Sequence, residues 1–144
     1  MATHILEADE FRLELLATIF DDDIDNTPVN AFLDIKVKND TFCGSASMEI
    51  DIKELAEFSL ALKKVYDTLG GSASFKEPYG NNGELSFTAD KKGHITVKGF
   101  IQTQTFGDVF RKNELQFETG FDQTYMKPFV DGIVNDYSEY TKRI

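Results

Sequence analysis

Apolar residues recur at every second position along most of this chain, and this two-residue period is the feature that most limits its fold. Successive side chains of a β-strand point to opposite faces, so the period predicts strands with one buried and one exposed face. Seven segments show it, namely residues 11–20, 31–38, 41–50, 72–79, 84–90, 94–104 and 113–121. Each of them is expected to be a half-buried strand.

Two other segments have the 3.6-residue period of an amphipathic helix. The first covers residues 52–69, with Asp51 as a candidate N-cap and Glu54 placed as in a capping box. The pair Gly70 and Gly71 supplies its stop signal. The second helix carries its apolar residues between positions 125 and 137.

The order of these elements is β-β-β-α-β-β-β-β-α, and the short connections favour antiparallel neighbours. Because every strand has one apolar face, the sheet should be covered on one side only. We therefore predict a single α+β domain over residues 1–144, a two-layer sandwich in which an antiparallel sheet of about seven strands carries both helices on one face. The residues expected to share the core are Leu13, Leu33, Met48, Phe58, Leu62, Phe87, Val97, Phe117, Phe129 and Ile133.

A polar triplet, Asp122-Gln123-Thr124, stands where the last predicted strand meets the last helix. Side chains of Asp and Thr accept hydrogen bonds from the unpaired N–H groups at a helix start. Pro128 must lie within the first turn, because further along it would cost a helical hydrogen bond. We therefore interpret the triplet as a helix cap rather than as a catalytic site.

The formal net charge is −10, and it is unevenly distributed. Residues 1–26 carry eight acidic side chains against a single arginine, a net charge of −7. Such a surface repels nucleic acid phosphates and anionic lipids, and it attracts a basic protein. We therefore expect a protein partner that is basic, no direct nucleic acid binding and no membrane association. The alternative interpretation is that the acidic charge only aids solubility.

The densest group of acidic residues is the run DDDIDN at residues 21–26, between two predicted strands. Asp21, Asp22, Asp23 and Asp25 are the candidate partner-binding residues, and a solvated turn is the alternative interpretation. A calcium loop would need Gly at its sixth position and Glu at its twelfth, where Asn26 and Phe32 stand. We therefore do not predict a metal site here.

The start of the chain, MATHILEADEF, has no basic region and no long apolar run, so a secretory signal is not expected. Cys43 is the one cysteine, which fits a reducing compartment and excludes an internal disulfide. No window approaches the roughly 18 apolar residues of a membrane span. The expected location is the cytoplasm.

Catalytic patterns are weak throughout. Cys43 and His94 have the chemistry of a nucleophile and a base, but the sequence does not bring them together, and His4 is expected in a loose N-terminal tail. No glycine-rich phosphate loop is present. The acidic residues fall on turns and exposed strand faces rather than in a predicted cleft. We predict no catalytic residue, no metal and no cofactor, and hence a protein that is not an enzyme.

Two segments in the second half carry a family resemblance. They are KKGHITVKGFI at residues 91–101 and NELQFETGFDQTYMKPFVDGI at residues 113–133, and the helix ELAEFSLALKKVYDTLGGSA fits by type and place. Together they resemble the WapI-type bacterial immunity proteins, which neutralise the toxic C-terminal domain of a polymorphic contact-dependent toxin. The resemblance covers residues 42–134 and implies a role in binding. No functional residue is transferred from it.

Three functions stay open at this point. The first is a cytoplasmic immunity protein that binds a cognate toxin domain, and a basic nuclease is the class of toxin that fits the acidic charge. The second is another non-enzymatic binding module, or a homodimer, that uses the exposed sheet face. The third is a small enzyme or metal protein, for which the residues give little support.

Overall fold

The computed structural model describes residues 3–77 and 82–143. Its first sheet contains β1 (His4–Ala8), β2 (Phe11–Ile19), β3 (Ala31–Asn39) and β4 (Phe42–Ile50), in that spatial order. Helix α1 (Ile52–Thr68) then leads to a second sheet, which contains β5 (Ser72–Lys76), β6 (Gly83–Ala89), β7 (His94–Thr105) and β8 (Arg111–Asp122). The chain ends in a 3₁₀ helix η1 (Gln123–Met126), α2 (Lys127–Tyr137) and a second 3₁₀ helix η2 (Ser138–Arg143).

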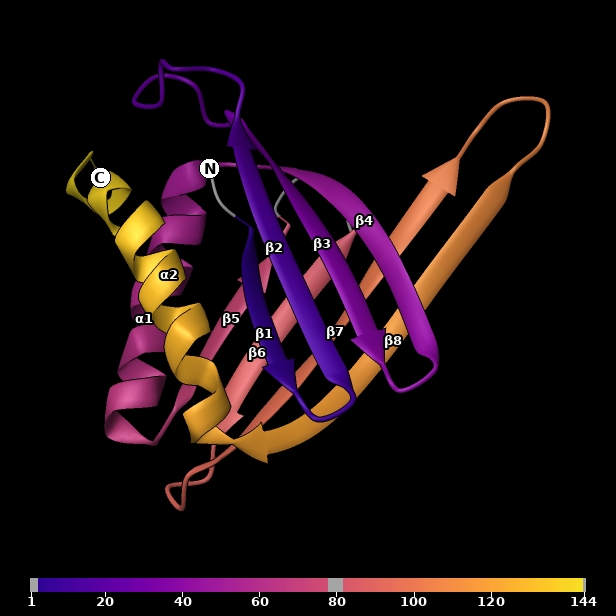
Figure 1. The fold of residues 1–144 in the computed structure, drawn as a ribbon. Helices are drawn as coiled ribbons and strands as arrows, with labels where there is room; N and C mark the ends of the chain where they lie inside the picture. The colour runs from indigo at the N-terminus through magenta and orange to yellow at the C-terminus, as the bar shows by residue number, and fades with distance from the viewer. Residues whose placement is uncertain (1–2, 78–81, 144) are drawn as a thin grey trace.

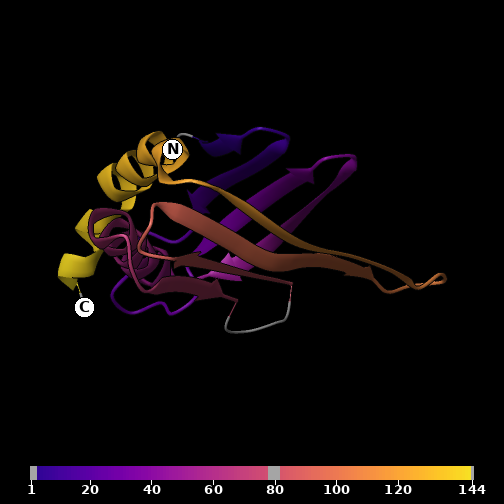
Figure 2. The same cartoon turned by 90° about the horizontal axis from the view of Figure 1, so that it is seen from below.

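All strand pairs are antiparallel, and the two sheets form separate layers with the helices together along one side (Figures 1 and 2). Helix α1 packs on β5 and β6, α2 packs on β1, and the two helices contact each other. On the opposite side, β4 contacts β7 and β8. The core therefore lies between the two sheets and is closed on one side by the helices.

The predicted α+β class and the antiparallel pairing are confirmed, and both helices lie on one side of the molecule, with α1 against the second sheet and α2 against the first. All seven predicted strands are present, although positions 78 and 79 of one of them lie outside the described residues. The ten residues predicted to share the core are all buried in one cluster. Polar side chains between them point outward, so each sheet has one exposed face.

The number of sheets differs from the prediction, since the described residues form two sheets of four strands rather than one sheet of about seven. The two-residue period shows which face of a strand is buried, but it does not show what covers that face. A long helix, α1, separates β4 from β5, so these strands are not joined as a hairpin. The second sheet instead faces the apolar side of the first, and each buries the other.

The expected loose tail is also wrong, because residues 4–8 form the edge strand β1. His4 is buried: its Nε2 lies 2.8 Å from the Asp136 carboxylate, and its ring meets Tyr137 edge-on at 5.4 Å. Gly132 leaves the space that the His4 ring occupies beside α2. In the sequence, five alternating residues (HILEA) cannot be distinguished from chance. In the structure, their backbone pairs with β2, and this pairing makes the segment a strand.

The predicted N-cap of α1 is confirmed, since the Asp51 Oδ1 accepts a hydrogen bond of 3.0 Å from the Lys53 backbone N–H. Buried Asn30 adds a second cap that was not predicted: its Oδ1 accepts from the Ile52 N–H at 2.8 Å, and its Nδ2 donates to Asp51. The helix ends at Thr68, and its C-cap Leu69 takes the left-handed conformation (φ 54°) in place of the expected glycine. Asn30 thereby fixes the end of the β2–β3 loop to the start of α1.

Gly99, in the middle of β7, lies where the sheet leaves no room for a side chain. A Cβ there would overlap the backbone oxygen of Glu84 and lie 3.1 Å from Phe117 Cζ. We expect Gly99→Ala to lower the free energy of unfolding by about 1–3 kcal/mol, the usual cost of overpacking, as measured by urea denaturation. Gly120→Ala in β8 is the control, because its Cβ would come no nearer than 3.7 Å to the Ile95 oxygen. Equal stability of the two variants would contradict this account of Gly99.

Candidate partner-binding surfaces

The acidic run predicted as a partner-binding site lies in the loop between β2 and β3, at the top of Figure 1. Two local hydrogen bonds shape it: the Asp23 N–H donates to Asp21 Oδ1 at 2.9 Å, and the Asn26 amide donates to Asp23 Oδ1 at 3.0 Å. The side chain of Ile24 is buried and anchors the loop to the core. The loop is therefore held in place at its centre while its carboxylates face outward.

Three of the four aspartates of this loop are exposed to solvent. Asp22, Asp23 and Asp25 are exposed, and Asp21 is half-buried. The one ion pair to this group among the described residues joins Asp25 to Lys53, with 3.9 Å between Oδ1 and Nζ. Since most of the negative charge has no cationic neighbour, the loop can attract a positively charged surface. No group of three His, Cys, Asp or Glu side chains suited to a metal occurs within residues 3–77 and 82–143.

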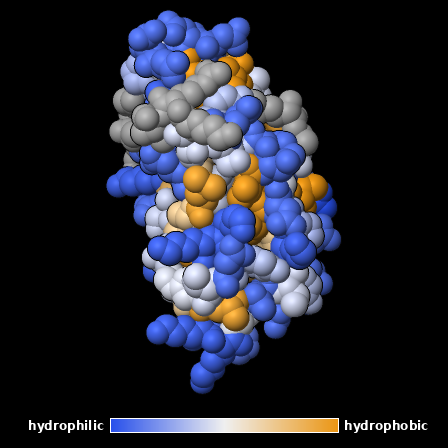
Figure 3. Space-filling model, turned by 90° about the vertical axis from the view of Figure 1, so that its left-hand side faces the viewer, coloured by the Kyte–Doolittle hydropathy of each residue, from blue (hydrophilic) through white to orange (hydrophobic). Residues whose placement is uncertain are grey.

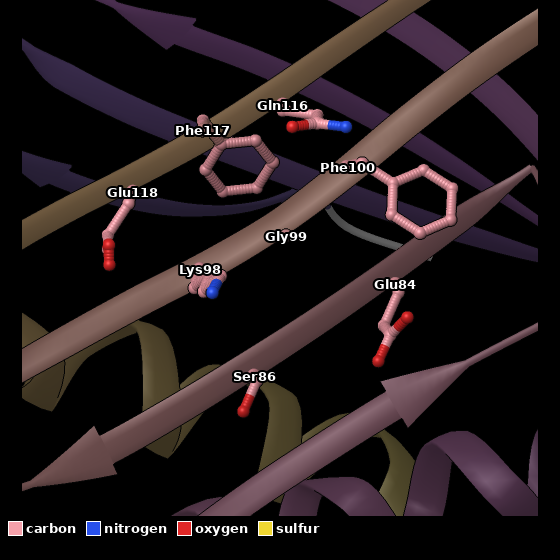
Figure 4. Close-up of a pocket in the computed structure, with 8 residues that line it drawn as sticks. All are labelled: Glu84, Ser86, Lys98, Gly99, Phe100, Gln116, Phe117 and Glu118. Carbon is pink, nitrogen blue, oxygen red and sulfur yellow. The ribbon is translucent and has the colours of Figure 1, made fainter.

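A second surface is a shallow pocket of about 680 Å³ on the outer face of the second sheet (Figure 4). Lys98 of β7 stands at its centre, opposite Ser86 of β6 and Glu118 of β8 in the ladder. One cation is thus surrounded by carboxylates and by the half-buried ring of Phe100. The lining residues are Glu84, Ser86, Lys98, Gly99, Phe100, Gln116, Phe117 and Glu118. This mixture suits contact with a polar protein surface, and it contains no nucleophile paired with a base.

The structure does not bring Cys43 and His94 together. His94, at the start of β7, has its Nδ1 2.9 Å from the Asp90 carboxylate. Cys43 is exposed at the start of β4, next to Gly44, which lies against Ile101. Ile101 is seven residues along β7 from His94, a distance of roughly 23 Å in an extended strand. The two side chains therefore cannot act as a nucleophile and its base.

The triplet at residues 122–124 is a helix cap, as predicted. The Thr124 backbone N–H donates to Asp122 Oδ1 at 2.9 Å, and Asp122 is the N-cap of η1. This backbone hydrogen bond is the main reason why the pKa of Asp122 lies below its usual value, and nearby His94 lowers that pKa further. Pro128 lies in the first turn of α2. The Asp122 carboxylate therefore accepts a hydrogen bond from the chain's own backbone, which is a structural role.

A third surface, at the tip of the β7–β8 hairpin, was missed in the sequence. The ladder continues to the pair Thr105–Arg111, and residues 103–114 are exposed on both faces, so the far end of this two-stranded ribbon projects beyond the rest of both sheets (Figures 1 and 2). Its tip carries Phe106, Val109 and Phe110, which are 78%, 60% and 59% exposed. The segment FGDVF was the available signal, because a turn between two strands is ordinarily polar.

The side formed by the two helices has a different character. Figure 3 shows this side as mostly hydrophilic, with hydrophobic areas that are small and separated by polar side chains. In the described part of the chain, no helix has the length and apolar character to cross a membrane.

Comparison with known proteins identifies one family. The family model described as immunity protein WapI-like matches residues 4–141. The sequence resemblance covered residues 42–134. The family match extends beyond both ends of that region and includes the acidic loop. No curated protein matches the chain.

Replacement of the capping carboxylate tests its structural role. We expect Asp122→Ala to lower the melting temperature by roughly a few degrees. Because the pKa of Asp122 is lowered in the folded state, the ionised group stabilises the fold above its unfolded pKa of about 3.9, and this contribution is lost as the pH falls through the folded value. The difference in melting temperature should therefore be full at pH 7 and shrink below about pH 4. Thermal unfolding followed by circular dichroism measures it. A variant that kept its melting temperature but lost its partner would instead make Asp122 a contact residue.

Proposed function

This chain belongs to the immunity protein WapI-like family, and we propose that it binds and neutralises the toxic C-terminal domain of a cognate bacterial toxin. The observation that carries the proposal is the family match over nearly the whole chain, residues 4–141. The protein acts in the cytoplasm, by occupying a surface that the toxin needs, and it performs no catalysis. It uses no cofactor.

The charge of the protein supports a basic toxin, of which a nuclease is the natural example. A nuclease binds phosphates, so its active surface is positively charged. A chain with a net charge of −10 complements that surface, which speeds encounter and favours this partner over neutral ones. The same charge disfavours direct contact of the immunity protein with nucleic acid.

The acidic loop is the proposed point of first contact. Asp21, Asp22, Asp23 and Asp25 repel one another, and Lys53 offsets this only at one edge of the loop. Lysine or arginine side chains from a toxin would turn that repulsion into attraction. Since Ile24 anchors the loop, little ordering is needed when the partner arrives.

A second arrangement uses the outer face of the second sheet, either for another partner or for a homodimer. The pocket around Lys98 favours it, because paired copies could place the carboxylates of one copy against the lysine of the other. The net charge opposes self-association, since each copy carries −10. Light scattering of the purified protein, at several salt concentrations, distinguishes a monomer from a dimer.

The central proposal is tested with the protein encoded immediately upstream. Expression of its C-terminal domain should stop growth, and co-expression of this chain should restore it. The two proteins should also co-purify as a stable complex. Continued toxicity in the presence of well-folded immunity protein would contradict the proposal.

Neutralising the acidic loop should slow complex formation. We expect the variant in which Asp21, Asp22, Asp23 and Asp25 are all replaced by Asn to associate with the toxin domain about tenfold more slowly at low salt, with a flatter salt dependence. Stopped-flow fluorescence over a salt series measures both. Stability of the free protein should hold or rise slightly, because repulsion is removed.

A control must remove the same charge from another place. Four exposed acidic residues on or near the helices, Glu57, Asp67, Asp131 and Glu139, can be changed to Gln or Asn for this purpose. If both variants slow association equally, only the total charge matters. If neither does, the loop is a solvated turn, and the binding surface lies elsewhere.

A further inference from the structure

The β7–β8 ribbon holds its tip in a defined place away from the body of the protein. Twelve ladder pairs join β7 to β8, from His94–Asp122 to Thr105–Arg111, and the last of them lie in the exposed part. The five-residue loop 106–110 closes the ribbon, with Gly107 in an extended, positive-φ conformation (φ 157°) that suits glycine. The ladder therefore projects whatever side chains the loop carries.

Folding does not account for the apolar side chains of that loop. The rings of Phe106 and Phe110 contact each other, with 5.5 Å between centroids, but neither belongs to the core cluster. Together with Val109 they expose on the order of 300–400 Å² of apolar surface, given the area of such side chains. Isolated apolar residues at a surface are ordinary, whereas a cluster of this kind at a projecting tip is typical of a binding surface.

We propose that Phe106, Val109 and Phe110 form a hydrophobic anchor that inserts into an apolar pocket of the toxin domain. This rests on the proposed function and adds to it the site of contact. Paired aromatic side chains surrounded by polar ones are the usual centre of a binding interface. The polar surroundings are present, since Asp108 lies within the loop and Arg111 begins β8.

The charge of the chain determines which occupant fits. Two copies would each carry a net charge of −10, and an anionic membrane would repel the same charge, so both are disfavoured as occupants. Next to the anchor, however, the local charge is zero, because two acidic side chains stand beside two basic ones: Asp108, Glu114, Arg111 and Lys112. Arg111 forms no ion pair among the described residues, so its guanidinium group is available for a carboxylate or carbonyl group at the rim of the pocket. The occupant is therefore a different protein, with an apolar pocket that has hydrogen-bond acceptors at its edge.

The anchor and the acidic loop should contribute differently to binding. The tip supplies at most about half of the roughly 800 Å² that each partner buries in a standard interface, so it cannot act alone. In Figure 1 the acidic loop extends from the upper left of the molecule and the ribbon tip from the upper right, so the two proposed contacts lie well apart. Charge at a rim acts mainly on the association rate, whereas a buried aromatic anchor acts mainly on the dissociation rate.

Removal of the two rings tests the anchor. The F106A/F110A double variant should dissociate from the purified C-terminal domain of the upstream-encoded toxin about 10²–10³-fold faster than the unmodified protein. Its association rate should fall by less than about threefold, and the salt dependence should be unchanged. Surface plasmon resonance measures the rates. The melting temperature of the free variant should not change, because the tip lies outside the core.

The control removes exposed apolar side chains from another part of the surface. Leu60 and Tyr125 are 41% and 42% exposed, and the L60A/Y125A variant should dissociate at the rate of the unmodified protein. Equal dissociation rates for F106A/F110A and the unmodified protein would overturn the anchor and leave the proposed function intact. No binding by the unmodified protein would overturn the proposed function, and the anchor with it.

Two further outcomes would assign the tip to a different occupant. If the unmodified protein were a dimer and F106A/F110A a monomer in light scattering, the tip would be a self-association surface. If the unmodified protein bound phosphatidylcholine or phosphatidylserine vesicles and the variant did not, the tip would insert into lipid. Either result would overturn the proposal.

Discussion

The structure depends on the mutual burial of two apolar sheet faces. Each four-stranded sheet has one polar face and one apolar face, and neither could stay in water alone without exposing a continuous row of Leu, Ile, Val and Phe side chains. The two apolar faces cover each other on the side where β4 contacts β7 and β8. On the other side, the helices cover them. Because the interior is used for packing, a partner must bind on the outside of the molecule: an outer sheet face, the outer side of the helices, a loop or the projecting ribbon.

One buried polar residue connects this core to the acidic loop. Asn30 is fully buried, a placement that costs free energy unless its amide is paired. Its side chain bonds to Asp51, Ile52 and the Thr27 carbonyl, and its backbone bonds to Phe20 and Ile50. The acidic loop thus ends at Asn30, whose side chain and backbone are all hydrogen-bonded. Four neighbouring carboxylates can be held in one short loop because its ends are fixed by contacts that do not involve their charge.

The sequence predicted the elements better than their arrangement, and the residues show why. The alternation in residues 31–38 predicts that Leu33, Ile35 and Val37 lie on one buried face. The same pattern is expected whether a helix or a second sheet covers that face, so it does not identify the covering layer. The strand at His4–Ala8 was missed because five alternating residues beside an acidic turn carry too little signal without their partner strand. Position-specific caps such as Asp51 and Asp122 were predictable, since their hydrogen bonds reach only two residues along the chain.

The surfaces were harder to predict than the core for a related reason. A core residue can be recognised from the periodicity of the sequence. A contact residue depends on the partner protein, and the sequence of this chain carries no pattern for it. The ribbon tip shows the difference: FGDVF carries no periodic pattern, and its exposure follows only from the structure, in which residues 103–114 of the β7–β8 hairpin extend beyond the rest of the second sheet. The acidic loop was easier, because charge density can be counted without a structure.

An inhibitor that works by occupying its target must remain bound, and the magnitudes show what that requires. Charge on a loop acts over about 8 Å at physiological salt, so it guides the partner during approach and weakens as salt rises. Burying the tip would stabilise a complex by roughly 8–10 kcal/mol of gross hydrophobic free energy at about 25 cal/mol per Å². Lost translational and rotational freedom costs about 4–15 kcal/mol, which is a similar amount. The tip can therefore offset the cost of association but leaves little net affinity. Tight binding then needs a further contact area beside it, and the outer face of the second sheet, which is continuous with the ribbon through β7 and β8, is the nearest surface that can supply it.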